Sequence, residues 1–257
     1  MRHLDRKRII LFQRKIWGYY RGHKRDLPWR PPTLKLWHGK ADPYQIWISE
    51  VMLQQTQVSR VLLKYPEFLR VFPTVQRLAK GPLSKVLKVW QGLGYNRRAL
   101  MLQRAAKVIV NEFGGTLPPS ITELSGLPGI GPSTAAGIMN FAFAVPTPYL
   151  ETNVRSVYLH YFFAKKKDVR DQEIIEIMLK MFPKGGVPRG AKPSTWFYAL
   201  LDYGVMLKKS HGNPNKRSAH YAKQSPFEGS RRQARARLLR RALKAGVGHR
   251  HLLRLLS

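Results

Sequence analysis

Glu50 stands in surroundings that could make it an acid catalyst. Glu50 has Ile46 and Leu53 one helical turn away on either side, and apolar surroundings raise the pKa of a carboxyl group, which keeps a proton available near neutral pH. A protonated carboxyl group can act as a general acid when a bond is cleaved. The alternative is a surface glutamate paired with an arginine, an ordinary arrangement in so basic a chain.

A turn with two glycines could bind an anion. The segment Leu127-Pro128-Gly129-Ile130-Gly131-Pro132-Ser133 precedes a run of small residues that predicts a helix. Gly129 and Gly131 let the backbone bend, so that successive N–H groups and the first amides of the helix point to one place. A DNA phosphate fits such a site. The alternative is a tight connection between two helices that binds nothing.

Helices are expected to position these residues. Asp42 fits an N-cap, Pro43 fits the first turn and Gln45 could close a capping box, so a helix should run through Leu53. The spacing of apolar residues predicts further helices at 57–71, 83–90, 97–113 and 133–143. Strand-like alternation is scarce, and we therefore expect an all-α protein.

The composition points to a polyanionic partner. The 257 residues include 46 lysines and arginines against 14 aspartates and glutamates, a net charge of +32, and self-repulsion of this size favours binding to nucleic acid. Hydrophobic residues make up 44% and aromatic residues 11%, as in a folded protein. No apolar run reaches the roughly 18 residues of a membrane span, and residues 1–15 lack a signal-peptide core. We expect a cytoplasmic monomer without membrane contact, associated with the nucleoid in a prokaryote.

The C-terminal fifth is the most basic part of the chain. Residues 208–257 hold fourteen lysines and arginines and one acid, Glu228. Ser230 and Gln233 fit a second capping box, and the helix that follows would carry an apolar stripe of Ala234, Leu238, Leu239, Ala242 and Leu243 between arginines. Two interpretations stay open and are compatible: the helix packs on the body with a solvated cationic face, or it contacts DNA directly.

Ordered motifs between residues 27 and 205 connect these features. They are Leu27-Pro28-Trp29-Arg30, Ile48-Ser49-Glu50-Val51-Met52-Leu53-Gln54-Gln55-Thr56-Gln57-Val58, Phe72-Pro73-Thr74, Gly92-Leu93-Gly94-Tyr95, the glycine turn, and Glu151-Thr152-Asn153-Val154. With these motifs the chain resembles the helix-hairpin-helix (HhH-GPD) DNA glycosylase superfamily, and within it the MutY-type adenine glycosylases most closely.

The resemblance implies a base excision repair enzyme that flips a mismatched or damaged base out of duplex DNA and hydrolyses its N-glycosidic bond. Glu50 then takes the general-acid position, protonating the base and afterwards handling the water. Glu151 takes the place of the carboxylate that stabilises the sugar cation, where the family almost always has aspartate in the pattern Asp-Gly-Asn-Val. The extra methylene leaves two alternatives open: a purely structural N-cap at Glu151, and a catalytically weak or silent lesion-binding protein.

Further site residues follow from the same resemblance. Ser133 stands where bifunctional members carry a Schiff-base lysine, and because a hydroxyl cannot form an imine, we expect a monofunctional enzyme without lyase activity. Gln54, Gln55 and Tyr95 are the residues that enter the DNA stack or touch the orphaned base. A buried core aromatic is the alternative for Tyr95.

The remaining candidate residues lie in the motif at 27–30, in the helices and in the glycine turn. Trp29 and Arg30, together with Ser133, resemble the segment that lines the base pocket. Trp47 and Trp90 have the helical spacing of core residues and are assigned to packing. Gly129, Gly131 and Ser133 form the expected phosphate site, and whether this turn also holds a structural cation is left open.

The absence of cysteine takes on meaning beside the resemblance. Zero cysteines exclude disulfides, thiolate-bound zinc, a cysteine nucleophile and an iron–sulfur cluster, whereas MutY-type and endonuclease III-type enzymes generally carry a four-cysteine cluster loop after the segment matched here by 202–206. We therefore expect no cofactor, and a cysteine-free remnant of that loop at 207–221. Its phosphate-contacting role would be kept by Lys208, Lys209, Lys216 and Arg217. A replacement metal at His211 and His220 is disfavoured, because no acid stands near them.

The expected organisation has two helical subdomains with DNA across the cleft between them. Residues 38–150 form a six-helix barrel with the hairpin, residues 1–37 and 151–227 form the second subdomain, and residues 228–257 form the basic helix and tail. We expect a variant without the C-terminal NUDIX-like domain that MutY-type enzymes reading 8-oxoguanine usually carry. Adenine opposite guanine or 8-oxoguanine is the expected target, and thymine or uracil opposite guanine is the alternative.

Overall fold

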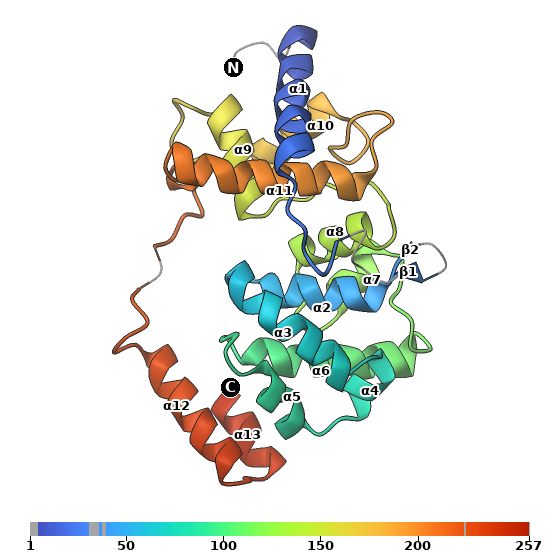
Figure 1. Cartoon of the computed structure of the whole chain (residues 1–257), viewed down its shortest axis with the longest axis vertical. Helices are drawn as coiled ribbons and strands as arrows, with labels where there is room; N and C mark the ends of the chain where they lie inside the picture. Colours follow the sequence, from blue (N-terminus) through green and yellow to red (C-terminus); the bar gives the residue numbers. More distant parts are fainter. Residues whose placement is uncertain (1–4, 31–35, 38–39, 224, 257) are drawn as a thin grey trace. The chain divides into compact units, whose positions relative to one another are not determined.

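The computed structural model describes residues 5–30, 36–37, 40–223 and 225–256. The chain divides into two compact units (Figure 1). Leu27–Ala135 and Gln224–Ser257 form one, called here the Glu50 unit, and Met1–Asp26 and Ala136–Lys223 form the other, the Glu151 unit. The sequence-based boundaries lie after residues 37, 150 and 227 instead. The basic C-terminal segment, which the sequence sets apart, falls within the Glu50 unit.

The Glu50 unit is a helical bundle with a small hairpin of strands. The paired strands, β1 (Leu36–Trp37) and β2 (Lys40–Ala41), are antiparallel and were not expected from the sequence. The helices are α2 (Pro43–Leu53), α3 (Val58–Val71), α4 (Val75–Lys80), α5 (Leu83–Trp90), α6 (Arg97–Glu112), α7 (Ile121–Gly126), α8 (Pro132–Phe141, which runs past the boundary at 135), α12 (Arg231–Lys244) and α13 (His249–Leu256). All five helices predicted in residues 43–143 are present, with ends within two residues of the prediction.

The start of α2 follows the predicted logic with one change. The Asp42 side chain accepts a hydrogen bond from the Tyr44 amide at 2.9 Å, which satisfies a donor that lacks an intrahelical partner. Gln45 donates from Nε2 to the Asp42 carboxylate at 3.1 Å, so it contacts the capping side chain rather than the backbone amide of a capping box. Both interactions fix where α2 begins, seven residues before Glu50.

Large aromatic side chains fill the core of the Glu50 unit. Trp47 and Trp90 are fully buried, as predicted, and Phe68 packs edge-on against Trp90 with 6.0 Å between ring centroids. Burial of such rings supplies most of the free energy that favours the folded unit. Trp47 stands three residues before Glu50, so the same packing that stabilises α2 also holds the glutamate in place.

The Glu151 unit consists of α1 (Arg6–His23), α9 (Thr152–Phe162), α10 (Asp171–Met181), α11 (Pro193–Ser210) and a short 3₁₀ helix, η1 (Pro214–Arg217). α11 packs along both α1 and α9 (Figure 1). Gly204 allows the close approach to α9, because a Cβ there would lie 2.2 Å from the carbonyl oxygen of Asn153. At the end of α1, Arg25 forms a 2.7 Å ion pair with the buried Asp202.

Apart from β1 and β2, the regular secondary structure of the described residues is helical, and the all-α class predicted from the sequence is correct. None of the helices described is both long enough and apolar enough to cross a membrane.

Candidate functional site

Glu50 lies at the edge of an apolar core. It is half-buried on α2, while its neighbours Trp47, Val51 and Met52 are all buried. The carboxyl group therefore borders an apolar interior and still reaches solvent. The general-acid role of Glu50 stays a prediction, and its place beside apolar side chains is compatible with it.

The end of α2 is joined to the glycine turn. Gln54 is the C-cap of α2, and its Nε2 donates a hydrogen bond of 2.9 Å to the hydroxyl of Thr134 on α8. Gln55 follows with a φ of 52° and is exposed. A left-handed backbone at a residue other than glycine is uncommon and turns the chain sharply. Gln54 and Gln55, which are expected to touch DNA, thus stand at a fixed turn beside the start of α8.

Arg98, which was not expected from the sequence to belong to the site, holds this turn together. Its Nη1 donates to the carbonyl oxygens of Val51, Met52 and Gln54 at 2.8, 3.0 and 2.5 Å. These are carbonyls at the C-terminal end of α2, where the helix leaves acceptors without an intrahelical partner. Burial lowers the pKa of Arg98 to about 10, so the guanidinium stays charged at neutral pH.

The same guanidinium reaches the loop that carries Tyr95. Nη2 of Arg98 donates to the carbonyl oxygen of Gly94 at 3.1 Å, and its Cζ lies 5.6 Å from the centre of the Tyr95 ring. Tyr95 is half-buried, with a φ of 48°, so it is neither a core aromatic nor a freely exposed ring. Arg98 therefore connects two left-handed residues, Gln55 and Tyr95, and fixes the loops on which they stand.

The glycine turn departs from expectation at one position. Gly129 has a φ of 77°, and a Cβ there would lie 2.7 Å from Cβ of Met101, so this position requires glycine. Gly131 has no positive φ, and a Cβ there would meet no atom within 4 Å; its conformation does not require glycine. Ser133 is exposed in the first turn of α8, where backbone amides lack intrahelical acceptors.

Trp29 and Arg30, which the resemblance places at the base pocket, are both buried. Trp29 is 3% exposed and packs edge-on against Tyr65 with 5.5 Å between ring centroids, and Arg30 is 4% exposed. The ring of Trp29 is thus part of the core packing, and its assignment to the base pocket stays a prediction. The indole of Trp29 helps to hold the segment that ends at Arg30 against α3.

Glu151 caps α9 in the other unit. One carboxylate oxygen, Oε1, accepts hydrogen bonds from the amides of Asn153 and Val154 at 2.5 and 3.0 Å. Burial raises the pKa of Glu151, and these two bonds and the positive charge of Lys208 act in the opposite direction. The carboxylate is thus held by the first free amides of the helix, with Asn153 Nδ2 3.3 Å from its second oxygen, Oε2.

Lys208 belongs to the surroundings of Glu151. Its Nζ donates a 2.9 Å hydrogen bond to Oδ1 of Asn153, the residue whose amides bind the Glu151 carboxylate. Burial lowers the pKa of Lys208, and the charge of Glu151 opposes that shift. The expectation that Lys208 contacts phosphate at the surface is revised, because the half-buried ammonium is directed to Asn153 within the protein.

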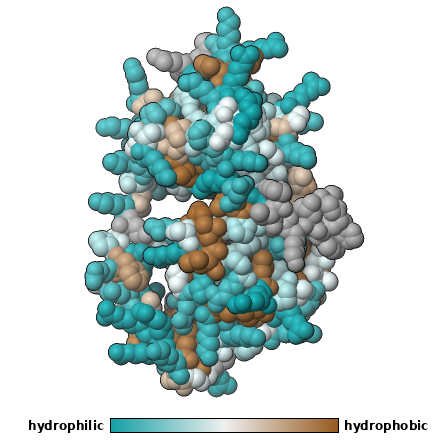
Figure 2. Space-filling model, viewed as in Figure 1, coloured by the Kyte–Doolittle hydropathy of each residue, from teal (hydrophilic) through white to brown (hydrophobic). Residues whose placement is uncertain are grey.

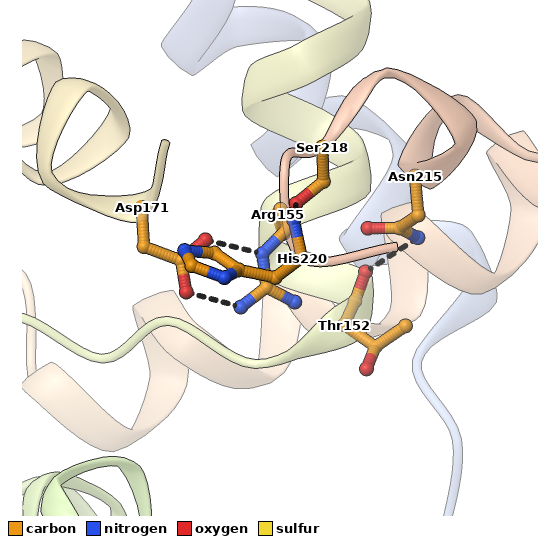
Figure 3. Close-up of polar contacts among 6 residues, drawn as sticks. All are labelled: Thr152, Arg155, Asp171, Asn215, Ser218 and His220. Atoms are coloured by element: carbon orange, nitrogen blue, oxygen red, sulfur yellow. Dashed lines mark hydrogen bonds and ion pairs between the residues drawn. The ribbon is translucent and has the colours of Figure 1, made fainter. Parts of the chain in front are cut away.

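The loop at 207–221 is held by polar contacts (Figure 3). Asn215 is 5% exposed, and its Nδ2 donates to the carbonyl oxygen of Thr152 at 3.1 Å and to the hydroxyl of Ser156 at 2.6 Å. Beside it, Arg155 forms a two-pronged ion pair with Asp171 at 2.8 and 2.7 Å. The start of α9, just after Glu151, is thereby fixed to the loop.

The other cations of this loop divide into two kinds. Arg217 is half-buried and donates from Nη2 to the carbonyl oxygen of Leu159 at 3.0 Å, so it too serves the protein interior. Lys209 and Lys216 are exposed. Only these two of the four expected phosphate contacts have the placement that such contacts require.

The loop does not fit an iron–sulfur cluster. Such clusters are held by thiolates, the chain has no cysteine, and the buried polar residues of the loop are Asn215 and Ser218. Among the described residues, no group of three or more histidine, aspartate or glutamate side chains is placed to hold a metal ion. His211 instead packs edge-on against His160, with 5.2 Å between ring centroids.

The structure therefore brings together Glu50, Gln54, Gln55, Tyr95 and the glycine turn within one unit, and Glu151 and the 207–221 loop within the other. Arg98, Asn153 and Asn215 were missed. Arg98 and Asn215 act through contacts distant in sequence, whereas Asn153 contacts both the nearby Glu151 and the distant Lys208. Two of the three had a usable signal: Asn153 belongs to the motif at 151–154, and Arg98 is a cation three residues after Tyr95.

Comparisons with known proteins support the resemblance. The model of the HhH-GPD superfamily base excision DNA repair proteins matches residues 48–184. An adenine DNA glycosylase of Buchnera aphidicola subsp. Baizongia pistaciae (strain Bp) is 37% identical over 154 residues, 60% of this chain and 42% of the relative. An adenine DNA glycosylase of Rattus norvegicus is 40% identical over 147 residues, 57% of this chain and 28% of the relative. This chain thus spans less than half the length of these relatives.

The fold is also shared with solved structures. A thermostable thymine-DNA glycosylase superposes with a TM-score of 0.64 at 25% identity, over 78% of this chain and 87% of its own. The family match covers more than half of the 257 residues, from within α2 to just beyond α10. It includes Glu50, the Arg98 contacts, the glycine turn and Glu151. The chain belongs to the HhH-GPD superfamily of base excision DNA repair proteins.

Proposed function

We propose that this chain is a monofunctional DNA glycosylase that flips and hydrolytically removes adenine opposite guanine or 8-oxoguanine in duplex DNA. The observation that carries the proposal is the fixed arrangement around the end of α2. The half-buried Glu50 lies one turn before Gln54, and the side chain of Gln54 donates a hydrogen bond to Thr134 on α8. The names of the relatives, adenine DNA glycosylase, support adenine as the base.

In the proposed reaction, Glu50 donates its proton to the departing adenine while the C1′–N bond breaks. Positive charge develops on the sugar, and the Glu151 carboxylate stabilises it. Water then adds to C1′, giving up a proton to Glu50, and the products are free adenine and an abasic site. The first amides of α8, with Gly129 and Ser133, bind a phosphate of the DNA.

A panel of duplexes tests this proposal. Each duplex carries a single A, T, U or C opposite guanine or 8-oxoguanine, and alkali after incubation cleaves the strand where a base was removed. We expect cleavage at adenine. Cleavage only at thymine or uracil opposite guanine would establish the second candidate, which the similarity to a thymine-DNA glycosylase supports. Binding without cleavage in any lane would show a silent lesion-binding protein.

Ser133 predicts that the enzyme has no lyase activity. A hydroxyl cannot form an imine with the sugar aldehyde, so borohydride should trap no covalent complex of the protein with DNA, as seen by denaturing electrophoresis. A bifunctional glycosylase of the same superfamily serves as the positive control. A trapped band that depends on borohydride would contradict the monofunctional assignment.

We further propose that the chain functions without an iron–sulfur cluster. Purified protein that releases adenine should contain no stoichiometric iron by elemental analysis and show no visible absorption. Removal of trace metal by a chelator should leave its rate unchanged. Iron at a fixed ratio to protein, lost together with activity, would contradict this proposal.

Replacing Lys208 by methionine should change the pH dependence of base release. The ammonium of Lys208 favours the ionised form of Glu151, so its loss raises the pKa of that carboxyl group further. Because the ionised form stabilises the sugar cation, the acidic limb of the kcat–pH profile should move to higher pH. Lys180→Met, which removes an exposed lysine from α10 of the same unit, is the matched control and should leave the profile in place. An unmoved limb in Lys208→Met would show that Lys208 does not act on Glu151.

A further inference from the structure

The C-terminal hairpin, residues 225–256, is built onto the Glu50 unit. α13 packs against α5, and α12 packs against α13 (Figure 1). The contact is apolar and consists of buried side chains from both helices, namely Leu239, Ala242, Leu243, Leu252 and Leu256. Ala234 and Leu238, which the sequence placed in the apolar stripe, are exposed instead, Leu238 by 51%. The hairpin therefore has a defined inner face and a defined outer face.

The outer face is strongly cationic. Exposed lysines and arginines stand along both helices, while residues 225–256 contain one acid, Glu228. They are Arg231, Arg235, Arg237, Arg240, Arg241, Lys244, Arg250 and Arg254. Figure 2 shows hydrophilic side chains along the outer edge of the hairpin, at the lower left. Such a concentration of one charge favours a polyanion at this surface.

One arginine of the C-terminal hairpin, Arg232, contacts Tyr95 of the candidate site. Nη1 of Arg232 lies 3.3 Å from the Tyr95 hydroxyl, to which it donates a hydrogen bond. Its Nη2 donates to the carbonyl oxygens of Ser225 and Pro226 at 2.5 and 3.3 Å. The half-buried guanidinium thus joins the Tyr95 ring to the start of the hairpin. Tyr95 lies between two arginines, Arg98 and Arg232.

Helical geometry sorts the exposed arginines of α12 relative to this contact. At about 100° per residue, Arg231 and Arg235 lie about 100° and 60° from Arg232 on one side of the helix, whereas Arg237 and Arg241 lie about 140° and 180° from it. Arginine binds phosphate with a planar pair of donors, and phosphate contacts set the register of a protein on DNA. Arg231 and Arg235 stand within one turn of the residue that holds Tyr95.

We propose that α12 is a second DNA-binding element of this protein, in which Arg231 and Arg235 bind backbone phosphates of the DNA that Tyr95 enters, while Arg232 is a positioning residue for the Tyr95 ring. The inference rests on the proposed function, because it takes Tyr95 as the residue inserted into DNA. Binding of the backbone by α12 and placement of the ring are then coupled, since both depend on the first turns of one helix.

The first experiment compares two double variants of the full chain that remove equal charge, Arg231→Gln with Arg235→Gln, and Arg237→Gln with Arg241→Gln. Fluorescence anisotropy gives the affinity for a duplex with a stable abasic-site analogue at several salt concentrations. The slope of log affinity against log salt should fall by about 2 in the first variant, about 1 for each lost phosphate contact. It should fall by less than half as much in the second. Equal losses in both variants would overturn the phosphate assignment.

The second experiment tests the coupling to Tyr95. Arg232→Ala should reduce the preference for the abasic duplex over a fully paired duplex by about 3- to 10-fold. Tyr95→Phe, which removes only the hydroxyl, should do the same, and the double variant should lose no more than either single variant. Losses that multiply in the double variant would overturn the positioning role. Tyr95→Phe keeps the test valid if Arg232→Ala folds poorly.

The inference and the proposed function fail in distinguishable ways. If the duplex panel shows no base release while the two double variants differ as expected, α12 is a DNA-binding element of a silent binder and the proposed glycosylase activity is wrong. If adenine is released and the two double variants behave alike, the activity stands and the role of α12 is wrong.

Discussion

Replacing Glu50 by glutamine should abolish base release while DNA binding is retained. Glutamine has the shape of glutamate but carries no transferable proton, so the general-acid contribution of about 10²- to 10⁴-fold in rate is lost. Glu50 is half-buried on α2 between buried neighbours, and a substitution of equal size leaves that packing intact. Single-turnover measurement of adenine release, with anisotropy for affinity, separates the two effects.

The matched control is Glu112→Gln, the same change at an exposed position on α6 of the same unit. It should keep the wild-type rate. Retained base release in Glu50→Gln would remove Glu50 from the reaction, and loss of binding together with rate would assign it a structural role. A rate lost at unchanged affinity is expected for an interaction made only in the transition state.

Replacing Arg98 by alanine should have the largest effect on stability. The substitution leaves the carbonyl oxygens of Val51, Met52 and Gln54 without their shared donor, and the hydroxyl of Thr56 loses its 2.8 Å bond from Nη2. Charged hydrogen bonds lost from a half-buried site lower the free energy of unfolding by about 2 to 4 kcal/mol. For a chain of this size the Tm should fall by about 5 to 15 °C.

Arg98→Lys distinguishes geometry from charge. A lysine keeps the positive charge but cannot reach several carbonyls with one planar group, so it should recover less than half of the lost stability. Arg97→Ala, an exposed arginine at the preceding position of α6, should change the free energy of unfolding by less than about 0.5 kcal/mol. Thermal and urea unfolding give these values. Equal effects at 97 and 98 would contradict the role assigned to Arg98.

Arg98→Ala should also weaken recognition of the opposite base. Gln55 and Tyr95 both have left-handed φ values, 52° and 48°, and such conformations persist only when surrounding contacts enforce them. Without the guanidinium, both loops relax toward ordinary backbone conformations. At a temperature where the variant is folded, the preference for an abasic-analogue duplex over a paired duplex should therefore decrease.

Local patterns were enough to predict the helices and the turn. The N-cap at Asp42, the apolar spacing from 83 to 90 and the glycine at 129 act through nearby residues, and the structure agrees at each. Gly131 and Leu238 were misjudged for the opposite reason. Whether a glycine needs its freedom, or a leucine its burial, depends on what packs against it.

The long-range contacts of the site could not be read from the sequence. Arg98 lies 47 residues from Val51, and Lys208 lies 55 residues from Asn153. In a chain with 46 lysines and arginines, no pattern separates the few that are directed inward from the many that face solvent. The expectation that Lys208 and Arg217 contact phosphate was reasonable on charge alone, but packing against α9 decides otherwise.

Glu151 caps α9, and this bears on the effect of its side chain, which is one methylene longer than the aspartate usual in the family. The amides of Asn153 and Val154 donate hydrogen bonds to one oxygen of the Glu151 carboxylate. These bonds, and not the length of the side chain, fix where the carboxylate lies. Aspartate caps bind the amides of the same helical positions, so a folded-back glutamate can present its carboxylate at the same end of the helix despite one more methylene. The N-terminus of α9 can therefore hold the carboxylate of either aspartate or glutamate. Glutamate in place of the family's aspartate then leaves the negative charge at the same end of the helix.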